Sequence, residues 1–332
     1  MTDTLIFDSA WRLMHDHADA ATFAAVERGV WPATLWKSLV GAGFGDMLGD
    51  GVAAGAADAL QVMRAQGQSA APVPLLEAML AVALGQTGTD AKPTLVALPQ
   101  HAAQHPNPSS TVTARWPAAS RALACTPAGW ALLEAPLNPT LPGYAGEPQA
   151  SVDVSAAHLQ AYPAETDFET LWQFAALARA AQMRGALEHM LALTVEYANT
   201  RVQFGKPLGK QQAVQHQLAL MAEEVAAAGV AVDFAAARFG SASSAARKEA
   251  VAVAKLRAGE ATGKAAEIAH QIHGAIGFTQ EYQLQRYSRR AWAWRDECGN
   301  EDEWALWLGR QVTRPDAPPI WHTITQSASP QP

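Results

Sequence analysis

The second half of the chain contains three long stretches in which apolar and small residues are spaced as on one face of a helix. The first runs from Leu187 to Ala198, the second from Val214 to Val232, and the third from Ala254 to Ile268. Within each stretch these residues recur three and four positions apart, which aligns them along a single helix face. Long helices with such faces bury them against one another, so the spacing predicts an antiparallel helical bundle.

The first half of the chain has a different pattern. Residues 5–88 read as short helices, with glycine-marked turns and a break at Ala71–Pro74. Prolines interrupt the segment that follows, and its short β-prone runs predict a small sheet or partial barrel. The predicted strands are Thr94–Leu98, Thr111–Trp116, Arg121–Cys125, Trp130–Glu134 and Ala150–Val154. We therefore expect a mainly α fold with a small β domain: a helical domain over 1–90, a β domain over 91–160, the bundle over 161–315 and a flexible tail over 316–332.

Composition excludes several classes of protein. Hydrophobic residues make up 49% and charged residues 17% of the 332 residues, a globular balance. The net charge is −7 without a block of lysine or arginine, so we expect no nucleic-acid partner. The chain shows neither a signal-peptide pattern nor an apolar run long enough for a membrane span, which favours a cytoplasmic protein. Its two cysteines form no CxxC motif, so we expect neither a disulfide framework nor a metal site.

The segment Tyr197–Leu208 (YANTRVQFGKPL) joins the first two helical stretches. A loop arginine, Arg201, beside an aromatic residue, Phe204, suits a ligand that carries phosphate and a flat ring. The guanidinium supplies a forked charged donor and the phenyl ring supplies a stacking face. On composition alone, an arginine that caps the end of its own helix is a simpler explanation.

The segment Gln271–Thr279 (QIHGAIGFT) ends the third helical stretch. Gly274 and Gly277 would let the backbone approach a ligand closely. A helix C-cap followed by an ordinary turn explains the same glycines without any ligand.

Taken together, the two segments resemble the C-terminal domain of the acyl-CoA dehydrogenase family. EYANTRVQFGKPLGKQQAVQHQLALM is similar to the family's YxxxRxxFGxPL stretch, and QIHGAIGFTQEYQLQRYSRRA is similar to its glycine-rich stretch that ends in RxxRDA. The resemblance is specific from Gly185 to Gly299 and looser before that. It implies a helix–sheet–helix architecture, an acyl-CoA substrate and an FAD cofactor. By this resemblance, Arg201 binds the FAD pyrophosphate, Phe204 packs on the FAD and Gln212 bonds its adenosine half.

The resemblance also implies an assembly. Gln271, with the backbone at Gly274 and Ala275, would hold the ADP part of a neighbouring subunit's FAD, so each FAD lies across two subunits of a dimer or tetramer. Electron-transfer flavoprotein is the electron acceptor that the resemblance implies.

The family's catalytic base is not in its usual place. In the family, a carboxylate removes the α-proton while the β-hydrogen passes to the flavin as hydride, and the carboxylate is usually a glutamate directly before a glycine. Here that stretch reads RDECGN, with Cys298 before Gly299 and Glu297 one position earlier. If the helix continued, Glu297 would be rotated by about 100° and face elsewhere. The family's second base position, ten residues before Gly185, holds Ala175.

Two other features of the sequence also depart from the family's pattern. About 60 residues separate Pro93 from Ser155, fewer than the family's middle domain usually needs, and Asn300 replaces an adenosine-binding threonine. The chain is thus similar to short, base-less subunits that pair with a full-length partner in α2β2 heterotetramers of bacterial steroid side-chain degradation. Two alternatives stay open. One is a self-sufficient homo-oligomeric acyl-CoA dehydrogenase that uses Glu297 or another carboxylate, and the other is a non-enzymatic scaffold that has lost flavin.

Overall fold

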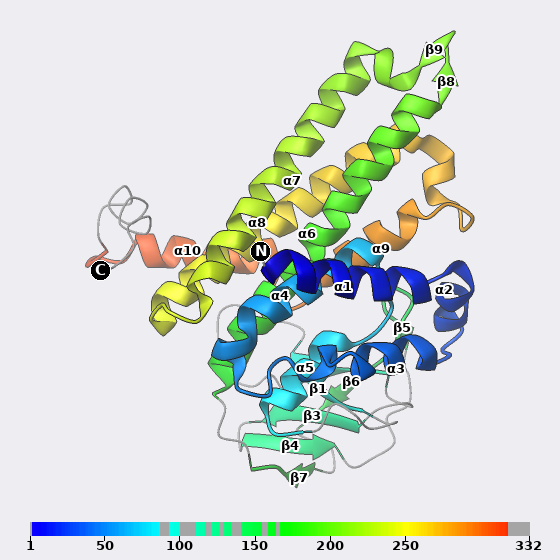
Figure 1. Ribbon diagram of the computed structural model, residues 1–332. Coiled ribbons are helices and arrows are strands. Elements are labelled where there is room, and N and C mark those ends of the chain that lie inside the picture. Colours follow the sequence, from blue (N-terminus) through cyan, green and yellow to red (C-terminus); the bar gives the residue numbers. More distant parts are fainter. Residues whose placement is uncertain are drawn as a thin grey trace.

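The computed structural model describes residues 2–86, 93–99, 111–116, 121–126, 129–133, 141–154, 159–163 and 167–317. Its N-terminal part is helical, as predicted (Figure 1). The elements are α1 (Thr2–His17), α2 (Ala20–Glu27), α3 (Ala33–Gly41), the 3-10 turn η1 (Phe44–Asp46), α4 (Val52–Ser69) and α5 (Leu75–Ala83). The predicted break at Ala71–Pro74 separates α4 from α5, where Ala70 has a positive φ of 51°.

A mixed sheet follows, with the strand order β5-β6-β2-β1-β3-β4-β7 in the described part of the chain. The strands are β1 (Thr94–Pro99), β2 (Thr111–Arg115), β3 (Arg121–Thr126), β4 (Gly129–Leu133), β5 (Leu141–Pro142), β6 (Pro148–Asp153) and β7 (Leu159–Ala161). The predicted strands all have a counterpart, although Glu134 lies outside the described residues. Strands β5 and β7 were not predicted because they are too short to show an alternating pattern. β1 and β3 are parallel and the other neighbours are antiparallel.

Alternation along the strands divides the buried side chains between two faces. Leu123 and Cys125 of β3 join the main core beneath the helices, whereas Ala122 and Ala124 join a smaller core on the opposite face. Figure 1 shows the sheet at one end of the molecule, beyond α3 and α5. The larger side chains therefore fasten the sheet to the helical part.

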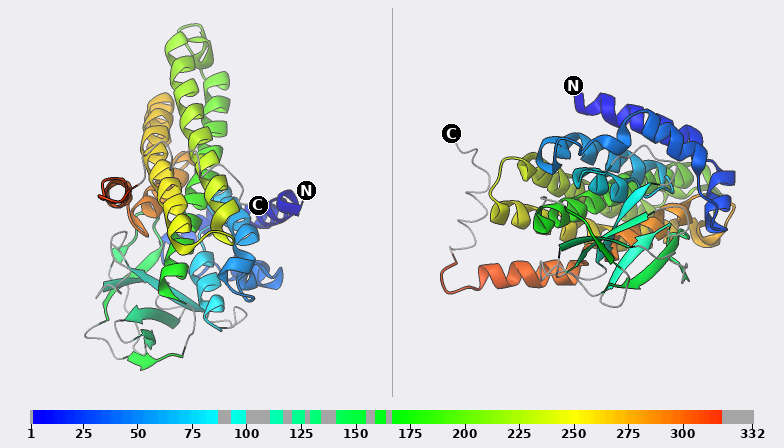
Figure 2. Two further views of the ribbon diagram at one scale, coloured as in Figure 1. Left: turned by 90° about the vertical axis from the view of Figure 1, so that its left-hand side faces the viewer. Right: turned by 90° about the horizontal axis from the view of Figure 1, so that it is seen from below.

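The C-terminal half forms the predicted bundle of long helices (Figures 1 and 2). Its elements are α6 (Phe168–Thr200), β8 (Val202–Gln203), β9 (Lys206–Pro207), the 3-10 turn η2 (Leu208–Lys210), α7 (Gln212–Phe239), α8 (Ser244–His273), the 3-10 turn η3 (Gly274–Phe278), α9 (Leu284–Asp296) and α10 (Glu301–Val312). Helix α6 spans about 50 Å and is central, because it packs against α4, α7, α8 and α9. Its half nearest the sheet is buried on every side, whereas its far end carries the β8–β9 hairpin beyond the rest of the molecule.

Two glycines let α4 and α6 approach each other closely. A Cβ at Gly67 would lie 1.9 Å from the Gln182 carbonyl oxygen, and one at Gly185 would lie 2.0 Å from the Arg64 carbonyl oxygen. Both distances are too short for any side chain, so this crossing requires glycine on each helix. The contact fixes the N-terminal helices against α6, whose Arg179 belongs to the ion cluster described below.

Most of the predicted tail, 316–332, lies outside the described residues. Among the residues that are described, no helix is both long and apolar enough to cross a membrane. The same residues contain no cluster of metal-binding side chains.

Candidate functional site

The segment that contains Arg201 and Phe204 forms a hairpin at the outer end of the bundle. Arg201 follows the last residue of α6, and its carbonyl accepts a hydrogen bond of 2.9 Å from the Leu208 amide. Phe204 and Gly205 both have positive φ values, 55° and 77°, as in the tight turns that join two-residue hairpins. The Phe204 ring is 88% exposed, although an apolar residue gains nothing from water and a positive φ is unfavourable for it. The exposed ring and guanidinium are therefore suited to an external ligand.

The segment that contains Gln271 ends α8 on a neighbouring part of the same surface. Gly274 has a φ of 64° and open space beside it, and Gln271, Gly274 and Ala275 are exposed. The stacked rings of Tyr197 and His273, with centroids 4.3 Å apart, connect this turn to the last turns of α6. A cavity of about 400 Å³ beside Gln271 and Gly274 is also lined by Phe278 and Trp292.

The residues predicted for the cofactor form two exposed groups whose chemistry suits FAD. Arg201, Phe204 and Gln212 offer a charged donor, a flat ring and an amide at the hairpin, and all three are exposed. Gln271 and the glycine turn offer an amide and an open backbone at the end of α8. Both groups of residues face outward rather than into a common interior cavity, which is the arrangement expected where a second subunit completes each site.

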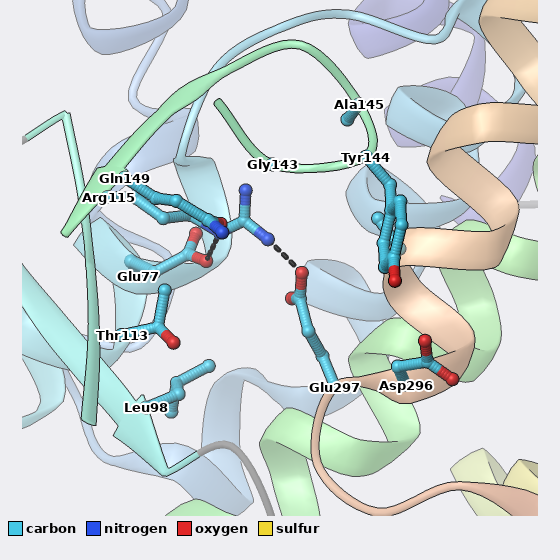
Figure 3. A pocket seen from close by; sticks show the side chains of 11 residues that line it. Glu77, Leu98, Thr113, Arg115, Gly143, Tyr144, Ala145, Gln149, Asp296 and Glu297 are labelled. Carbon is cyan, nitrogen blue, oxygen red and sulfur yellow. Dashed lines mark hydrogen bonds and ion pairs between the residues drawn. The ribbon is translucent and has the colours of Figure 1, made fainter. Parts of the chain in front are cut away.

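A separate interior cavity of about 300 Å³ lies between the sheet and the end of α9 (Figure 3). The residues that line it come from the sheet, α5, α9 and two loops. They are Glu77 of α5, Leu98 of β1, Thr113 and Arg115 of β2, the loop 143–145, Gln149 of β6 and residues 293, 296 and 297. The lining combines charged and polar groups with apolar ones. It also includes Glu297, the carboxylate nearest to the expected base position.

Buried ion pairs close one wall of this cavity. Arg115 Nε lies 2.9 Å from Glu77 Oε1, and its Nη1 lies 3.1 Å from Glu147 Oε2. Arg179 of α6 pairs with the same Glu77. Glu297 completes the cluster, because its Oε1 pairs with Arg115 and its Oε2 lies 2.7 Å from Arg179 Nη2. Both carboxylate oxygens of Glu297 are thus held by guanidinium groups.

The surroundings keep Glu77, Arg115 and Arg179 ionised. Burial alone would raise the pKa of Glu77, but Arg179 and Arg115 outweigh it and the pKa lies below its usual value. Burial would likewise lower the pKa of Arg115 and of Arg179, yet Glu297 and Glu77 hold both pKa values above the ordinary one. The cluster is therefore a set of mutually dependent charges.

The polar network continues from the cluster into the N-terminal helices. Arg179 Nη1 donates to Gln182 Oε1 over 2.8 Å, and Gln182 Nε2 donates to Gln66 Oε1 over 2.8 Å. Gln66 Nε2 in turn donates to the carbonyl oxygens of Ala71 and Val73, the latter over 2.6 Å. Hydrogen bonds thus connect the cavity wall to the break between α4 and α5.

The direction of Glu297 differs from the expectation based on a continuing helix. Helix α9 ends at Asp296, and Glu297 is extended, with φ −82° and ψ 144°. The rotation of a helical residue therefore does not apply, and Glu297 points into the interior cavity (Figure 3).

Neither expected base position carries a group that ionises at neutral pH. Ala175 is fully buried on α6, one turn before Arg179. Cys298 is also fully buried, with a positive φ of 57°, and burial raises the pKa of its thiol to about 12. Asn300, which replaces the expected threonine, caps α10 and accepts from the Glu303 amide over 3.0 Å.

Lys255 of α8 donates hydrogen bonds to the backbone near the linker between α9 and α10. Its buried Nζ donates to the carbonyl oxygens of Arg295, over 2.7 Å, and Gly299, over 2.6 Å. Trp304 adds a hydrogen bond of 3.0 Å from its indole nitrogen to the Cys298 carbonyl. Burial lowers the pKa of Lys255 to about 8, against the opposing influence of Cys298, Glu297 and Asp296.

Comparison with known proteins relates the C-terminal part of the chain to a family. The family model described as acyl-CoA dehydrogenase, C-terminal domain, matches residues 169–302, a stretch that includes both cofactor segments and the Glu297–Cys298 linker. Residues 169–302 are therefore an acyl-CoA dehydrogenase C-terminal domain. The chain is 41% identical over 117 residues to acyl-CoA dehydrogenase IpdE2 of Mycobacterium tuberculosis, covering 35% of each chain. The IpdE2 of Mycolicibacterium smegmatis is 35% identical over 152 residues, or 45% of this chain and 47% of that protein.

The matched stretch thus spans about a third to a half of these curated acyl-CoA dehydrogenases. Solved structures extend the likeness in fold to nearly the whole chain. The Tcur3481–Tcur3483 steroid ACAD variant has a TM-score of 0.79 at 24% identity, covering 93% of this chain and 97% of that one. The ChsE4–ChsE5 complex from Mycobacterium tuberculosis has a TM-score of 0.74 at 20% identity, covering 96% and 98%.

Sequence reasoning did not find Glu77, Arg115, Arg179 and Lys255. Each is a charged residue inside a segment that is otherwise apolar or alanine-rich, and charges are rarely buried without a partner. A single charged residue in such a segment is therefore a sequence signal of a buried ion pair. It does not reveal the partners, because these lie on distant segments of the chain.

Proposed function

We propose that this chain is an FAD-binding subunit of an acyl-CoA dehydrogenase that converts an acyl-CoA thioester to the enoyl-CoA but lacks its own catalytic base. One observation carries the proposal. Ala175 and Cys298 occupy the two base positions, and the adjacent carboxylate of Glu297 is held by Arg115 and Arg179. General-base catalysis needs a proton acceptor within hydrogen-bond reach of the reacting carbon. A longer partner of the same family would supply that acceptor.

The cofactor proposal assigns roles to the residues of the two exposed groups. Arg201 binds the FAD pyrophosphate through charge-assisted hydrogen bonds, Phe204 packs on the FAD and Gln212 bonds the adenosine half. Gln271 and the backbone from Gly274 hold the ADP part of a neighbouring subunit's FAD. FAD held by these residues would supply the acceptor for the β-hydrogen of the acyl group, which leaves as hydride. The exposure of all these residues supports a cofactor shared between subunits.

The proposed assembly is a heterotetramer with a longer acyl-CoA dehydrogenase. Two structural neighbours have names that join two chains, the ChsE4–ChsE5 complex and the Tcur3481–Tcur3483 steroid ACAD, and they support this arrangement. We propose a cytoplasmic role in the degradation of fatty acids or steroid side chains, with electron-transfer flavoprotein as the electron acceptor.

The test compares the purified chain with the chain co-expressed with candidate longer subunits. Flavin absorbance gives FAD per chain, and an artificial electron acceptor reports turnover of acyl-CoA. We expect little or no turnover by the chain alone and turnover by the complex. Turnover by the chain alone contradicts the proposal.

A self-sufficient enzyme is the alternative with a structural observation in its favour. The Glu297 side chain lines the interior cavity and is 24% exposed, so a base could act from it on a ligand in the cavity. On this alternative, Glu297→Gln abolishes turnover by the chain alone while FAD stays bound. A preparation of the complex in which this chain holds no flavin favours the scaffold alternative instead.

A further inference from the structure

Glu297 differs from the other carboxylates of the ion cluster. The side chains of Glu77 and Glu147 are only 2% and 8% exposed, so they are fixed parts of the interior. Glu297 is 24% exposed and comes from the short linker between α9 and α10. Its side chain lies on the cavity side of Arg115, as Figure 3 shows. Of the three carboxylates, Glu297 is therefore the one most accessible from the cavity.

Glu297 is one of three carboxylates that pair with the guanidinium groups of the cluster. Among the described residues, Arg115, Arg179 and Arg290 face Glu77, Glu147 and Glu297. Removal of Glu297 takes one carboxylate away from both Arg115 and Arg179. An uncompensated buried charge is strongly unfavourable. The cavity wall therefore requires a carboxylate at this position, but the chain itself need not provide it.

The cavity offers room for a ligand that brings its own carboxylate. Its volume of about 300 Å³ corresponds to roughly ten water molecules, enough for a short-chain acid. Thr113 and Gln149 supply polar groups near Arg115, and Leu98 supplies an apolar surface. Arginine presents a planar fork that suits a carboxylate.

We propose that Arg115 and Arg179 form a binding site for the carboxylate of a small organic acid, either free or at the far end of an acyl group, and that Glu297 occupies this site until the ligand displaces it. Binding requires neither flavin nor a partner subunit, so its test is independent of the proposed function.

The test is isothermal titration of the purified chain with glutarate at neutral pH and fixed ionic strength. Glu297→Gln keeps the size of the side chain and removes the competing charge. We expect it to bind glutarate roughly ten- to hundredfold more tightly than the parent, the value of one charge-assisted hydrogen bond. Asp296→Asn is the matched control, because it removes the same charge from the adjacent, exposed residue.

The outcomes separate cleanly. A gain confined to Glu297→Gln, and lost when Arg115→Gln is added, supports the site. An equal gain in Asp296→Asn shows a general effect of net charge and overturns it. No gain in a folded Glu297→Gln protein also overturns it, as does an equal gain for the uncharged glutaramide.

Two further arms complete the test. Should Glu297→Gln fail to fold, Glu297→Asp replaces it, because the shorter side chain keeps its charge but reaches the guanidiniums poorly and should still raise the glutarate affinity. An unchanged affinity there refutes the proposal. Comparison of glutarate with glutaryl-CoA distinguishes the sources: tighter binding of glutaryl-CoA identifies an acyl group, and equal or weaker binding identifies a free acid.

Discussion

Lys255 has a measurable consequence for the stability of the protein. Its ammonium group is buried beneath the α9–α10 linker and bonded to the carbonyl oxygens of Arg295 and Gly299. Burial lowers its pKa from an ordinary 10.5 to about 8. This difference in pKa means that folding favours the neutral form of Lys255 over the protonated form by about 3 kcal/mol. The full difference applies because the group is not exposed to solvent.

The free energy of unfolding changes with pH because the folded and unfolded chains bind different numbers of protons. Between pH 8 and 10.5 the unfolded chain holds a proton on Lys255 and the folded chain does not. The contribution of Lys255 to the free energy of unfolding therefore rises with pH across this window and is least favourable below pH 8. Cys298, which faces Lys255, stays a neutral thiol in the folded protein because its pKa is about 12. Titration of Cys298 in the unfolded chain is common to both variants and cancels.

The assay is urea unfolding followed by circular dichroism, repeated from below pH 8 to above pH 10.5. The parent protein is compared with Lys255→Met. We expect the free energy of unfolding of the parent, relative to the variant, to increase by about 3 kcal/mol over the window. Lys264→Met is the control, because Lys264 lies on the same helix but pairs with Glu267 in solvent. A difference between parent and Lys255→Met that does not change with pH refutes the reasoning.

Three further predictions concern the cofactor, a thiol and a helix crossing. Arg201→Ala should weaken FAD binding by roughly 1.5–3 kcal/mol, because one charge-assisted bond is lost, and flavin retained through gel filtration measures this. Cys298 should resist iodoacetamide in the folded protein, since its pKa of about 12 leaves almost no thiolate, and mass spectrometry should detect alkylation only after unfolding. Gly185→Ala should destabilise the protein by roughly 1–3 kcal/mol, because the new Cβ meets the Arg64 carbonyl oxygen. In thermal unfolding, Gly263→Ala should lack this loss, because its Cβ would lie 3.5 Å from the nearest neighbour, Arg295 Nη1.

Local patterns predicted the fold well where each element is long enough to show its period. The stripe of Ala254, Ala258, Ala261, Ala265 and Ile268 is fully buried in α8, as its spacing indicated. The sheet was predicted from short β-prone runs between prolines, but not its strand order. That order depends on pairings between distant segments, such as parallel β1 and β3, which no local pattern records.

The candidate site divides in the same way. The residues assigned to FAD lie within two continuous motifs, so a resemblance could suggest them, and their roles stay predictions. The absence of a carboxylate at Ala175 and Cys298 is equally visible in the sequence. The direction of Glu297 is not visible in the sequence, because it depends on α9 ending at Asp296. The ion cluster is not visible either, because its members come from several distant segments.

The position of Arg179 determines how the chain can be divided. Its guanidinium pairs with Glu77, which precedes it by about a hundred residues, and with Glu297, which follows it by more than a hundred. A fragment that keeps α6 but lacks either end of the chain leaves this charge buried without one of its counter-ions, a loss of roughly 3–5 kcal/mol. The N-terminal helices and the bundle therefore depend on each other for stability, and truncated versions should be expected to aggregate or unfold rather than behave as separate modules.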